Sequence, residues 1–194
     1  MVTLPAQTTT ALKEWASVLE AIDRGEQLVL IRKGGLIEPG SGFELAASCF
    51  VLYPTFEHQT IQYLRPSFQP LMEEALRHRP AEGQVRVSLG AMVVSSVQSQ
   101  DPDVIERVRA FHVYNEAFVS QRLKWQPEQL LAIVVVRAFR LPSPQLLSVA
   151  PHYAGCRSWV QLDAPVVLRD AVPVLDDATF APRAQQLTAL LTSA

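Results

Sequence analysis

The sequence has few cysteines, little net charge and no long hydrophobic run. Its two cysteines, Cys49 and Cys156, lack CxxC spacing and lie in apolar or mixed surroundings, which favours free buried thiols in a reducing cytoplasm over a disulfide. No segment approaches the roughly 18 apolar residues that a membrane span needs, and the first residues lack the basic and apolar regions of a signal peptide. We therefore predict a cytoplasmic protein without a membrane partner.

The overall charge gives no general attraction to polyanions. The formal net charge is -2 over 194 residues, of which 19% are charged and 48% hydrophobic, and these are ordinary values for a globular protein. A chain of this length buries most of its apolar surface without help from disulfides or metals. Any site for a nucleic acid or a phosphate must therefore be a local patch.

The first half of the chain is predicted to contain one helix and two strands. Thr10 can cap a helix whose apolar residues share one face, and Gly25 can end that helix in a left-handed conformation. Residues 27–31 indicate a strand buried on both faces, and residues 43–53 indicate a second strand that Pro54 stops. Because short glycine-containing turns join these strands, we expect them to pair antiparallel.

The second half of the chain alternates helices with longer strands. Pro70 suits the first position of a short helix. Residues 85–97 alternate apolar and polar side chains as in a half-buried strand, in which Gly90 marks a bulge or a bend. The other predicted elements are an interrupted helix over 101–122, a strand over 130–141, a short strand over 158–162 and a final helix that Thr179 caps.

These elements predict an α+β fold with a mixed, mostly antiparallel sheet, open or barrel-like, flanked by helices. Residues 10–163 would form a single α+β domain. Residues 164–194 would form an acidic, proline-containing connection and a C-terminal helix that packs on the domain.

Two of the predicted strands end in polar residues. Arg32-Lys33-Gly34-Gly35 follows the first strand, and Glu57-His58-Gln59 follows the second. Backbone N–H groups at a Gly-Gly turn and a forked guanidinium both suit a phosphate, whereas two cations at a hairpin end also serve solubility alone. Neither the P-loop motif nor the GxGxxG motif is present, so the pattern indicates an anion contact without a known nucleotide fingerprint.

Basic and aromatic residues are interleaved between residues 107 and 140. The cations are Arg107, Arg109, Arg122, Lys124, Arg137 and Arg140, against the carboxylates Glu116 and Glu128. Tyr114, Trp125 and Phe139 lie among them. Arginines beside aromatic side chains suit phosphate contact and base stacking on single-stranded nucleic acid. The alternative is that the arginines face solvent and that Trp125 packs in the core.

Three segments of the chain stand out together. They are Leu30-Ile31-Arg32-Lys33-Gly34-Gly35, Pro54-Thr55-Phe56-Glu57-His58-Gln59 and Tyr153-Ala154-Gly155-Cys156-Arg157-Ser158-Trp159-Val160. In these segments the chain resembles an uncharacterised bacterial family of domains of unknown function, over roughly residues 10–163. That family has no assigned chemistry, so this resemblance implies no activity.

The stretch from Gly25 to Arg32 carries a second, weaker resemblance. It is similar to the helix and strand that PUA-like small barrels, including the ASCH and EVE groups, place before their ligand site. Those barrels bind RNA or modified nucleotides in a cleft beside the barrel. The ASCH-type pattern expects a lysine shortly after the glycine and Glu-x-Arg at the strand end, whereas this chain has Gln27 and Ile31-Arg32 without the glutamate. The similarity is therefore limited to the order of elements.

These patterns favour a small module that binds a nucleotide or RNA in a local basic cleft. The predicted ligand-binding residues are Arg32, Lys33, Gly34, Gly35, Glu57, His58, Gln59, Arg122, Lys124, Arg137, Arg140, Arg157 and Trp159. No motif requires a cofactor or a metal, and the sequence does not define an oligomeric state.

Two other classes of function stay open. A hydrolytic or metal-dependent enzyme would need Glu44, Glu57, His58 and His152 to converge, and neither HExxH nor Glu-x-Lys supports one. A protein–protein interaction module would instead expose an apolar patch.

Overall fold

The computed structural model describes residues 4–33, 43–155 and 157–192. Its centre is a seven-stranded sheet with the order β2-β5-β4-β3-β1-β6, to which β7 adds by pairing with β5. The strands are β1 (Gln7–Trp15), β2 (Val29–Arg32), β3 (Cys49–Thr55), β4 (Gln84–Ser99), β5 (Leu131–Ser148), β6 (Trp159–Val167) and β7 (Val172–Pro173). β1 and β3 are parallel, and the other described pairings are antiparallel. The predicted α+β class and the mixed, mostly antiparallel sheet are confirmed.

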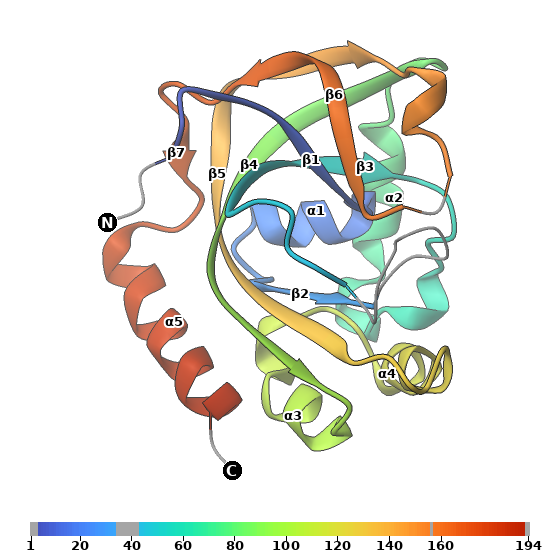
Figure 1. Cartoon of the computed structure of the whole chain (residues 1–194), viewed down its shortest axis with the longest axis vertical. Helices are drawn as coiled ribbons and strands as arrows, with labels where there is room; N and C mark the ends of the chain where they lie inside the picture. The colour runs from blue at the N-terminus through green and yellow to red at the C-terminus, as the bar shows by residue number, and fades with distance from the viewer. Residues whose placement is uncertain (1–3, 34–42, 156, 193–194) are drawn as a thin grey trace.

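The sheet curves without closing. β4 and β5 pair along almost their whole length, and bulges between Val87 and Leu89 and between Val93 and Ser95 bend the pair. Figure 1 shows both as long curved strands. Within the residues described, β2 and β6 lie at opposite ends of the strand order and do not pair. The fold is therefore the open form of the predicted sheet.

Five α-helices flank the sheet in the described part of the chain. They are α1 (Ala16–Asp23), α2 (Pro70–Arg77), α3 (Pro102–Arg107), α4 (Glu116–Lys124) and α5 (Asp177–Thr192). In Figure 1, α1 lies inside the curve of the sheet, α3 and α4 lie together at one end, and α5 runs along the outside. None of these helices is both long enough and apolar enough to cross a bilayer, as judged over the described residues.

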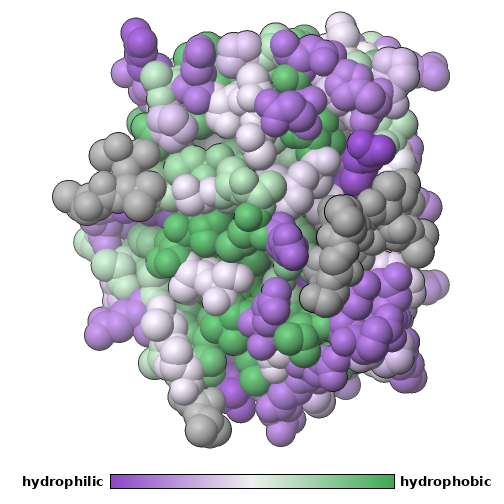
Figure 2. Space-filling view, viewed as in Figure 1, coloured by the Kyte–Doolittle hydropathy of each residue, from purple (hydrophilic) through white to green (hydrophobic). Residues whose placement is uncertain are grey.

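The core has two parts because the curved sheet buries side chains on both faces. The larger cluster joins α1, α4 and α5 to the middle of the sheet, and its members include Leu19, Phe118, Leu187 and Val134. A smaller cluster lies among β1, β3 and β6, around Val51. On the face shown in Figure 2, apolar side chains also reach the surface in a band across the middle, with hydrophilic side chains above and below.

The prediction of a helix from Thr10 was wrong for its first half. Residues up to Trp15 form β1, and the helix begins only at Ala16. β1 pairs with β3 on one side and with β6 on the other, so tertiary hydrogen bonds on both sides fix the extended backbone. The three threonines from Thr8 to Thr10 agree with a strand, because β-branched side chains favour it.

The predicted pairing of the two early strands was also wrong. β2 pairs with β5, whereas β3 pairs with β1 and β4. The second strand begins at Cys49 rather than at Phe43, and it continues through Pro54 to Thr55. The described pairing of β3 with β4 stops at Val51, so the missing N–H of Pro54 lies on a free edge, where proline is tolerated.

The second half of the chain agrees with its pattern. α2 begins at Pro70, the interrupted helix appears as α3 and α4, and β4, β5 and β6 cover the predicted strands. Phe180, Ala184, Leu187 and Leu191 form the buried stripe of α5. The N-terminal cap of α5 differs from the prediction, because Asp176 and not Thr179 is the capping residue. Its carboxylate accepts a hydrogen bond from the N–H of Thr179 at 2.8 Å.

Gly25 ends α1 as predicted, with φ at +70°. The N–H of Gly25 donates to the Ile22 carbonyl at 2.9 Å and that of Glu26 to the Ala21 carbonyl at 2.9 Å, which is a Schellman motif. A Cβ at Gly25 would lie 2.5 Å from Leu175 Cδ2, so both the backbone and the space require glycine.

Gly25→Ala is therefore expected to lower the free energy of unfolding by about 2 kcal/mol, measured by urea denaturation. Gly83→Ala is the matched control, because Gly83 has φ at +77° but no described neighbour within 4 Å of the position that a Cβ would take. The control should lose about 1 kcal/mol from backbone strain alone. Equal losses in the two variants would show that the contact with Leu175 adds nothing.

Candidate functional site

A cleft of about 270 Å³ opens where β1, β2 and β3 end beside α4. β1 and β3 are parallel and in register, with Trp15 opposite Thr55, so both strands bring their carboxyl ends to the same edge of the sheet. The turn after β3 and the segment before β6 complete the walls. The topology therefore gathers at one place residues that are more than a hundred positions apart in the sequence, such as Lys13 and Arg157.

Glu14 is the buried carboxylate of this cleft. Its Oε2 lies 3.3 Å from Arg32 Nη1, and the two side chains are only 3% and 16% exposed. Its Oε1 accepts hydrogen bonds from the Trp15 N–H at 2.8 Å and from the Tyr114 hydroxyl at 3.4 Å. Burial raises the pKa of Tyr114 well above its ordinary value, and the charge of Glu14 adds to that rise. The phenol therefore stays protonated and donates to the carboxylate.

Arg122 is a second cation on the same wall. The guanidinium lies over the Phe118 ring, 5.1 Å from its centroid. Arg122 forms no ion pair with any described residue, and its buried Nε has no hydrogen-bond partner there. Burial lowers the pKa of Arg122, and the charge of Arg32 lowers it further, but a guanidinium remains protonated at neutral pH.

Two lysines of the cleft have structural contacts. Lys33 is 5% exposed, and its Nζ donates to the carbonyls of Arg122 at 2.9 Å and Leu123 at 3.4 Å. It therefore provides a hydrogen-bond donor for two carbonyls in the last turn of α4. Burial lowers the pKa of Lys33. Lys13 donates to the carbonyls of Tyr153 and Gly155. With Arg32, Arg122 and Arg157, five cationic side chains line the cleft, against the carboxylates of Glu14 and Glu57.

Aromatic rings form one wall of the cleft. Tyr114 stacks on Phe118 with ring centroids 3.8 Å apart, and Trp15 meets both rings edge-on at 5.9 and 5.7 Å. Trp125, directly after α4, also lines the cleft, and none of the described ring pairs includes it. Its half-buried indole therefore has a face without an aromatic neighbour among these pairs.

The cleft brings together several of the residues predicted to bind a ligand. Arg32, Lys33, Glu57, His58, Arg122 and Arg157 all line it. Glu57 and His58 are exposed at the tip of the turn after β3, where His58 has φ at +59°. Gly34 and Gly35 lie outside the described residues, as does Cys156. Parts of all three segments that stand out in the sequence thus share one cleft.

Gln59 and Trp159 flank the cleft without lining it. The side-chain oxygen of Gln59 accepts from the N–H and hydroxyl of Ser17, at 3.3 and 3.2 Å, at the start of α1. Trp159 stacks on Phe43 and donates its indole N–H to the Glu44 carbonyl at 2.9 Å.

In the basic strip over residues 122–140, three of the cations predicted to bind a ligand lie outside the cleft. Lys124 lies at the end of α4 and lines two other hollows. Arg137 pairs with Asp177 at the start of α5, and Arg140 pairs with Asp23 at the end of α1, with 2.5 Å between Nε and Oδ1. Of the cations in this strip, only Arg122 lines the cleft, because the arginines of strand β5 form ion pairs elsewhere.

The residues of the enzyme alternative are also divided. Glu57 and His58 line the cleft, whereas Glu44 and His152 do not. His152 is exposed and its Nε2 lies 3.2 Å from Asp163 Oδ1. Across the described residues, no three histidine, cysteine, aspartate or glutamate side chains gather closely enough to hold a metal ion.

Sequence reasoning missed the contribution of β1 to the site. Lys13, Glu14 and Trp15 line the cleft, but the prediction of a helix from Thr10 left all three out of the candidate site. The signal that could have found them is the run Thr8-Thr9-Thr10, which favours a strand and thus directs the end of that strand to the edge of the sheet.

A comparison with known protein families identifies the family of this chain. A family described as "Domain of unknown function (DUF1802)" matches residues 11–186, which confirms the resemblance drawn from the three segments and carries it beyond residue 163. A search of curated proteins found no match.

Similar solved structures include ASCH from Zymomonas mobilis and a serine-to-alanine mutant of it. The first is 12% identical with a TM-score of 0.41, covering 93% of this chain and 94% of that one. The mutant is 13% identical with a TM-score of 0.41, covering 96% and 99%. This is the group named by the weaker resemblance of residues 25–32, and scores at this level support no statement about a ligand.

Proposed function

Because the chain belongs to the DUF1802 family, whose function is unknown, its membership assigns no chemistry, and we propose from the geometry of the cleft that it binds a nucleotide or a segment of single-stranded RNA. The observation that carries this proposal is the pair Arg32 and Arg122, two partly buried cations beside a wall of aromatic rings, of which only Arg32 has a carboxylate partner among the described residues. The phosphate would lie on the arginines and the base on the rings.

The charge of the cleft supports an anionic ligand. Glu14 compensates Arg32, whereas Arg122 has no carboxylate within ion-pair distance among the described residues. A charge held in a partly buried place without a counterion is unfavourable, so an incoming anion gains more there than at an exposed arginine. The exposed Arg157 at the mouth adds a further charge that can contact a phosphate.

The aromatic wall supports a ligand with a planar ring. Trp125 is half-buried and lines the cleft, and an indole face can stack on any base, whatever the nucleotide sequence. A volume of about 270 Å³ accommodates one nucleotide unit rather than a folded nucleic acid. Because a single strand can place one unstacked base in such a cleft, RNA fits as well as a free nucleotide.

The test is a calorimetric titration with AMP, ribose 5-phosphate and a single-stranded RNA octamer, each at low and at moderate salt. Arg122→Gln is expected to weaken AMP binding about tenfold, because a charge-assisted contact to phosphate is lost. It should also reduce the salt dependence of RNA binding. Arg122 is a better target than Arg32 or Lys33, whose side chains hold Glu14 and the end of α4.

Arg77→Gln is the matched control, because it removes the same charge from an exposed position on α2. It should leave AMP affinity unchanged. AMP binding that exceeds ribose 5-phosphate binding would support the contact with the base. No binding of any of the three at low salt, or equal losses in both variants, would refute the proposal.

A further inference from the structure

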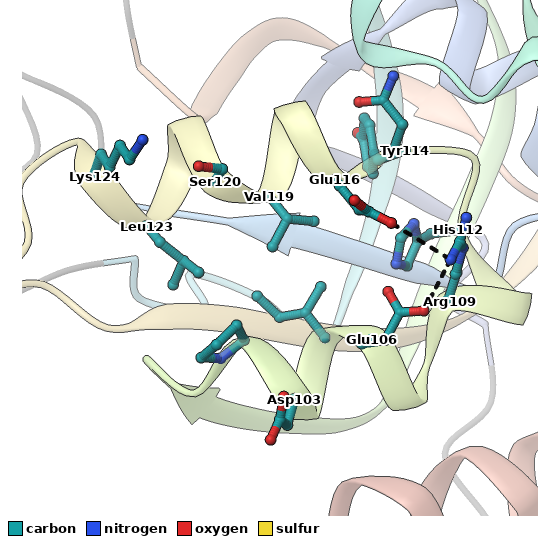
Figure 3. A pocket seen from close by; sticks show the side chains of 13 residues that line it. Asp103, Glu106, Arg109, His112, Tyr114, Glu116, Val119, Ser120, Leu123 and Lys124 are labelled. Atoms are coloured by element: carbon teal, nitrogen blue, oxygen red, sulfur yellow. Dashed lines mark hydrogen bonds and ion pairs between the residues drawn. The ribbon is translucent and has the colours of Figure 1, made fainter.

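A separate groove lies between α3 and α4, on the other side of α4 from the cleft. It has a volume of about 390 Å³, which is in the range of small-molecule sites. Figure 3 shows Val119 and Leu123 pointing from α4 toward α3, and Ile105 and Pro102 of α3 also line the space. Phe118 and Arg122 face the cleft instead, so α4 separates the two sites, with Tyr114 touching both.

His112 lies in the wall of this groove and is 2% exposed. Its ring nitrogens are buried and neither makes a direct hydrogen bond to a described residue, although the Ile105 carbonyl acts on the ring and opposes the fall of its pKa. The backbone around it is well held, because Arg65 donates to the His112 carbonyl and the next N–H, that of Val113, donates to the Gln27 side chain at 3.1 Å. A buried imidazole without a partner is unfavourable, and a ligand hydroxyl would supply both a donor and an acceptor.

The rim of the groove selects against charged ligands. Arg109 Nη1 lies 3.0 Å from Glu106 Oε1 and 3.9 Å from Glu116 Oε1, and Figure 3 shows both carboxylates directed toward the guanidinium. Asp103 and Lys124 at the other margin carry opposite charges. With cations and anions both present and Arg109 already paired, neither sign of ligand charge is favoured. The inner surface of the groove is predominantly apolar.

We propose that this groove is a second ligand site, which binds a small uncharged molecule with an apolar body and receives its hydroxyl group at His112. Apolar burial between Val119, Leu123 and Ile105 would supply the affinity, and the imidazole would supply the selectivity. Burial lowers the pKa of His112 to about 4, so the ring is neutral at pH 7 and can both donate and accept. This site does not depend on the function proposed for the cleft.

The experiment titrates the protein, labelled with ¹³C in its histidine rings, with phenol, toluene, benzoate and benzylammonium. The other three histidines, His58, His78 and His152, are exposed and serve as internal references. Phenol should shift the His112 signals to saturation and bind about five- to tenfold more tightly than toluene, because only phenol satisfies the ring nitrogens. Both charged probes should bind more weakly than phenol. His112 signals that do not respond to phenol would overturn the proposal.

Val119→Trp tests the location, because a large ring at this half-buried position fills the groove from its α4 side. It should abolish phenol binding, whereas Val172→Trp, which adds the same ring to an exposed position of β7, should leave it intact. Phenol binding that persists in Val119→Trp would overturn the assignment. If Val119→Trp does not fold, the test rests on the unaltered protein. There, phenol that binds no more tightly than toluene, as measured by the His112 signals, would overturn the proposal.

Discussion

Glu14→Ala is expected to lower the free energy of unfolding by about 3–5 kcal/mol, because it leaves the charge of Arg32 buried without this partner. The Glu14 side chain is 3% exposed, and it joins Arg32, the Tyr114 hydroxyl and the Trp15 N–H in one set of contacts. Removing one member of such a set costs more than its pairwise attraction, since the remaining groups stay buried and lose the acceptor that satisfied them. Urea denaturation, with unchanged m-values, measures the loss.

Glu57→Ala is the control for this prediction. It removes the same charge from the same cleft, but Glu57 is exposed, so the change should stay within about 0.5 kcal/mol. AMP should also stabilise Glu14→Ala more than it stabilises the unaltered protein, because Arg32 becomes available to the phosphate. If Glu14→Ala were no more destabilising than Glu57→Ala, the buried pair would not exist in solution.

Elements whose local pattern and burial agree could be predicted from the sequence. β4 alternates along its buried part, β5 is apolar through Val136, and α2 starts at a proline. In each of these, the contacts that the element makes in the fold reinforce what its own residues prefer. This is why the second half of the chain was predicted with few errors.

β1 and β2 could not be placed because their partners are distant in the sequence. Residues 10–15 show apolar spacing compatible with a helix, and only the pairing of β1 with β3 and with β6 decides for a strand. β2 likewise pairs with β5, about a hundred residues later, rather than with the next strand. A single sequence carries no direct record of such long-range pairing.

The candidate site was predicted in part for the same reason. Arg32 and His58 follow strands whose ends were recognised, so they were placed at one edge of the sheet. Glu14 was missed because it lies on the misassigned strand. Arg137 and Arg140 were included on local charge density alone, and β5 directs both toward ion pairs with Asp177 and Asp23. Charge along the chain does not define a surface until the strand direction is known.

Lowering the pH from 7 to 4 is expected to remove about 3 kcal/mol of stability through His112 alone. Burial lowers the pKa of His112 from 6.5 to about 4 in the folded protein, and the charges of Arg65 and Arg109 act in the same direction. The carbonyl of Ile105 and the charge of Glu106 oppose these effects. Between pH 6.5 and 4 the unfolded chain therefore binds one more proton than the folded chain, so stability decreases as the pH decreases.

Urea denaturation at several pH values between 7 and 4 measures this loss, and His112→Phe isolates it. The phenylalanine keeps a buried ring but cannot be protonated, so the variant should lack the slope of about 1.4 kcal/mol per pH unit that His112 adds below pH 6. Carboxylates that titrate in the same range affect both proteins equally and cancel in the difference. NMR titration of the His112 ring provides a check that needs no variant. An imidazole that protonates near pH 6.5 would contradict the prediction, because it would mean that solvent already hydrates the ring in the folded protein.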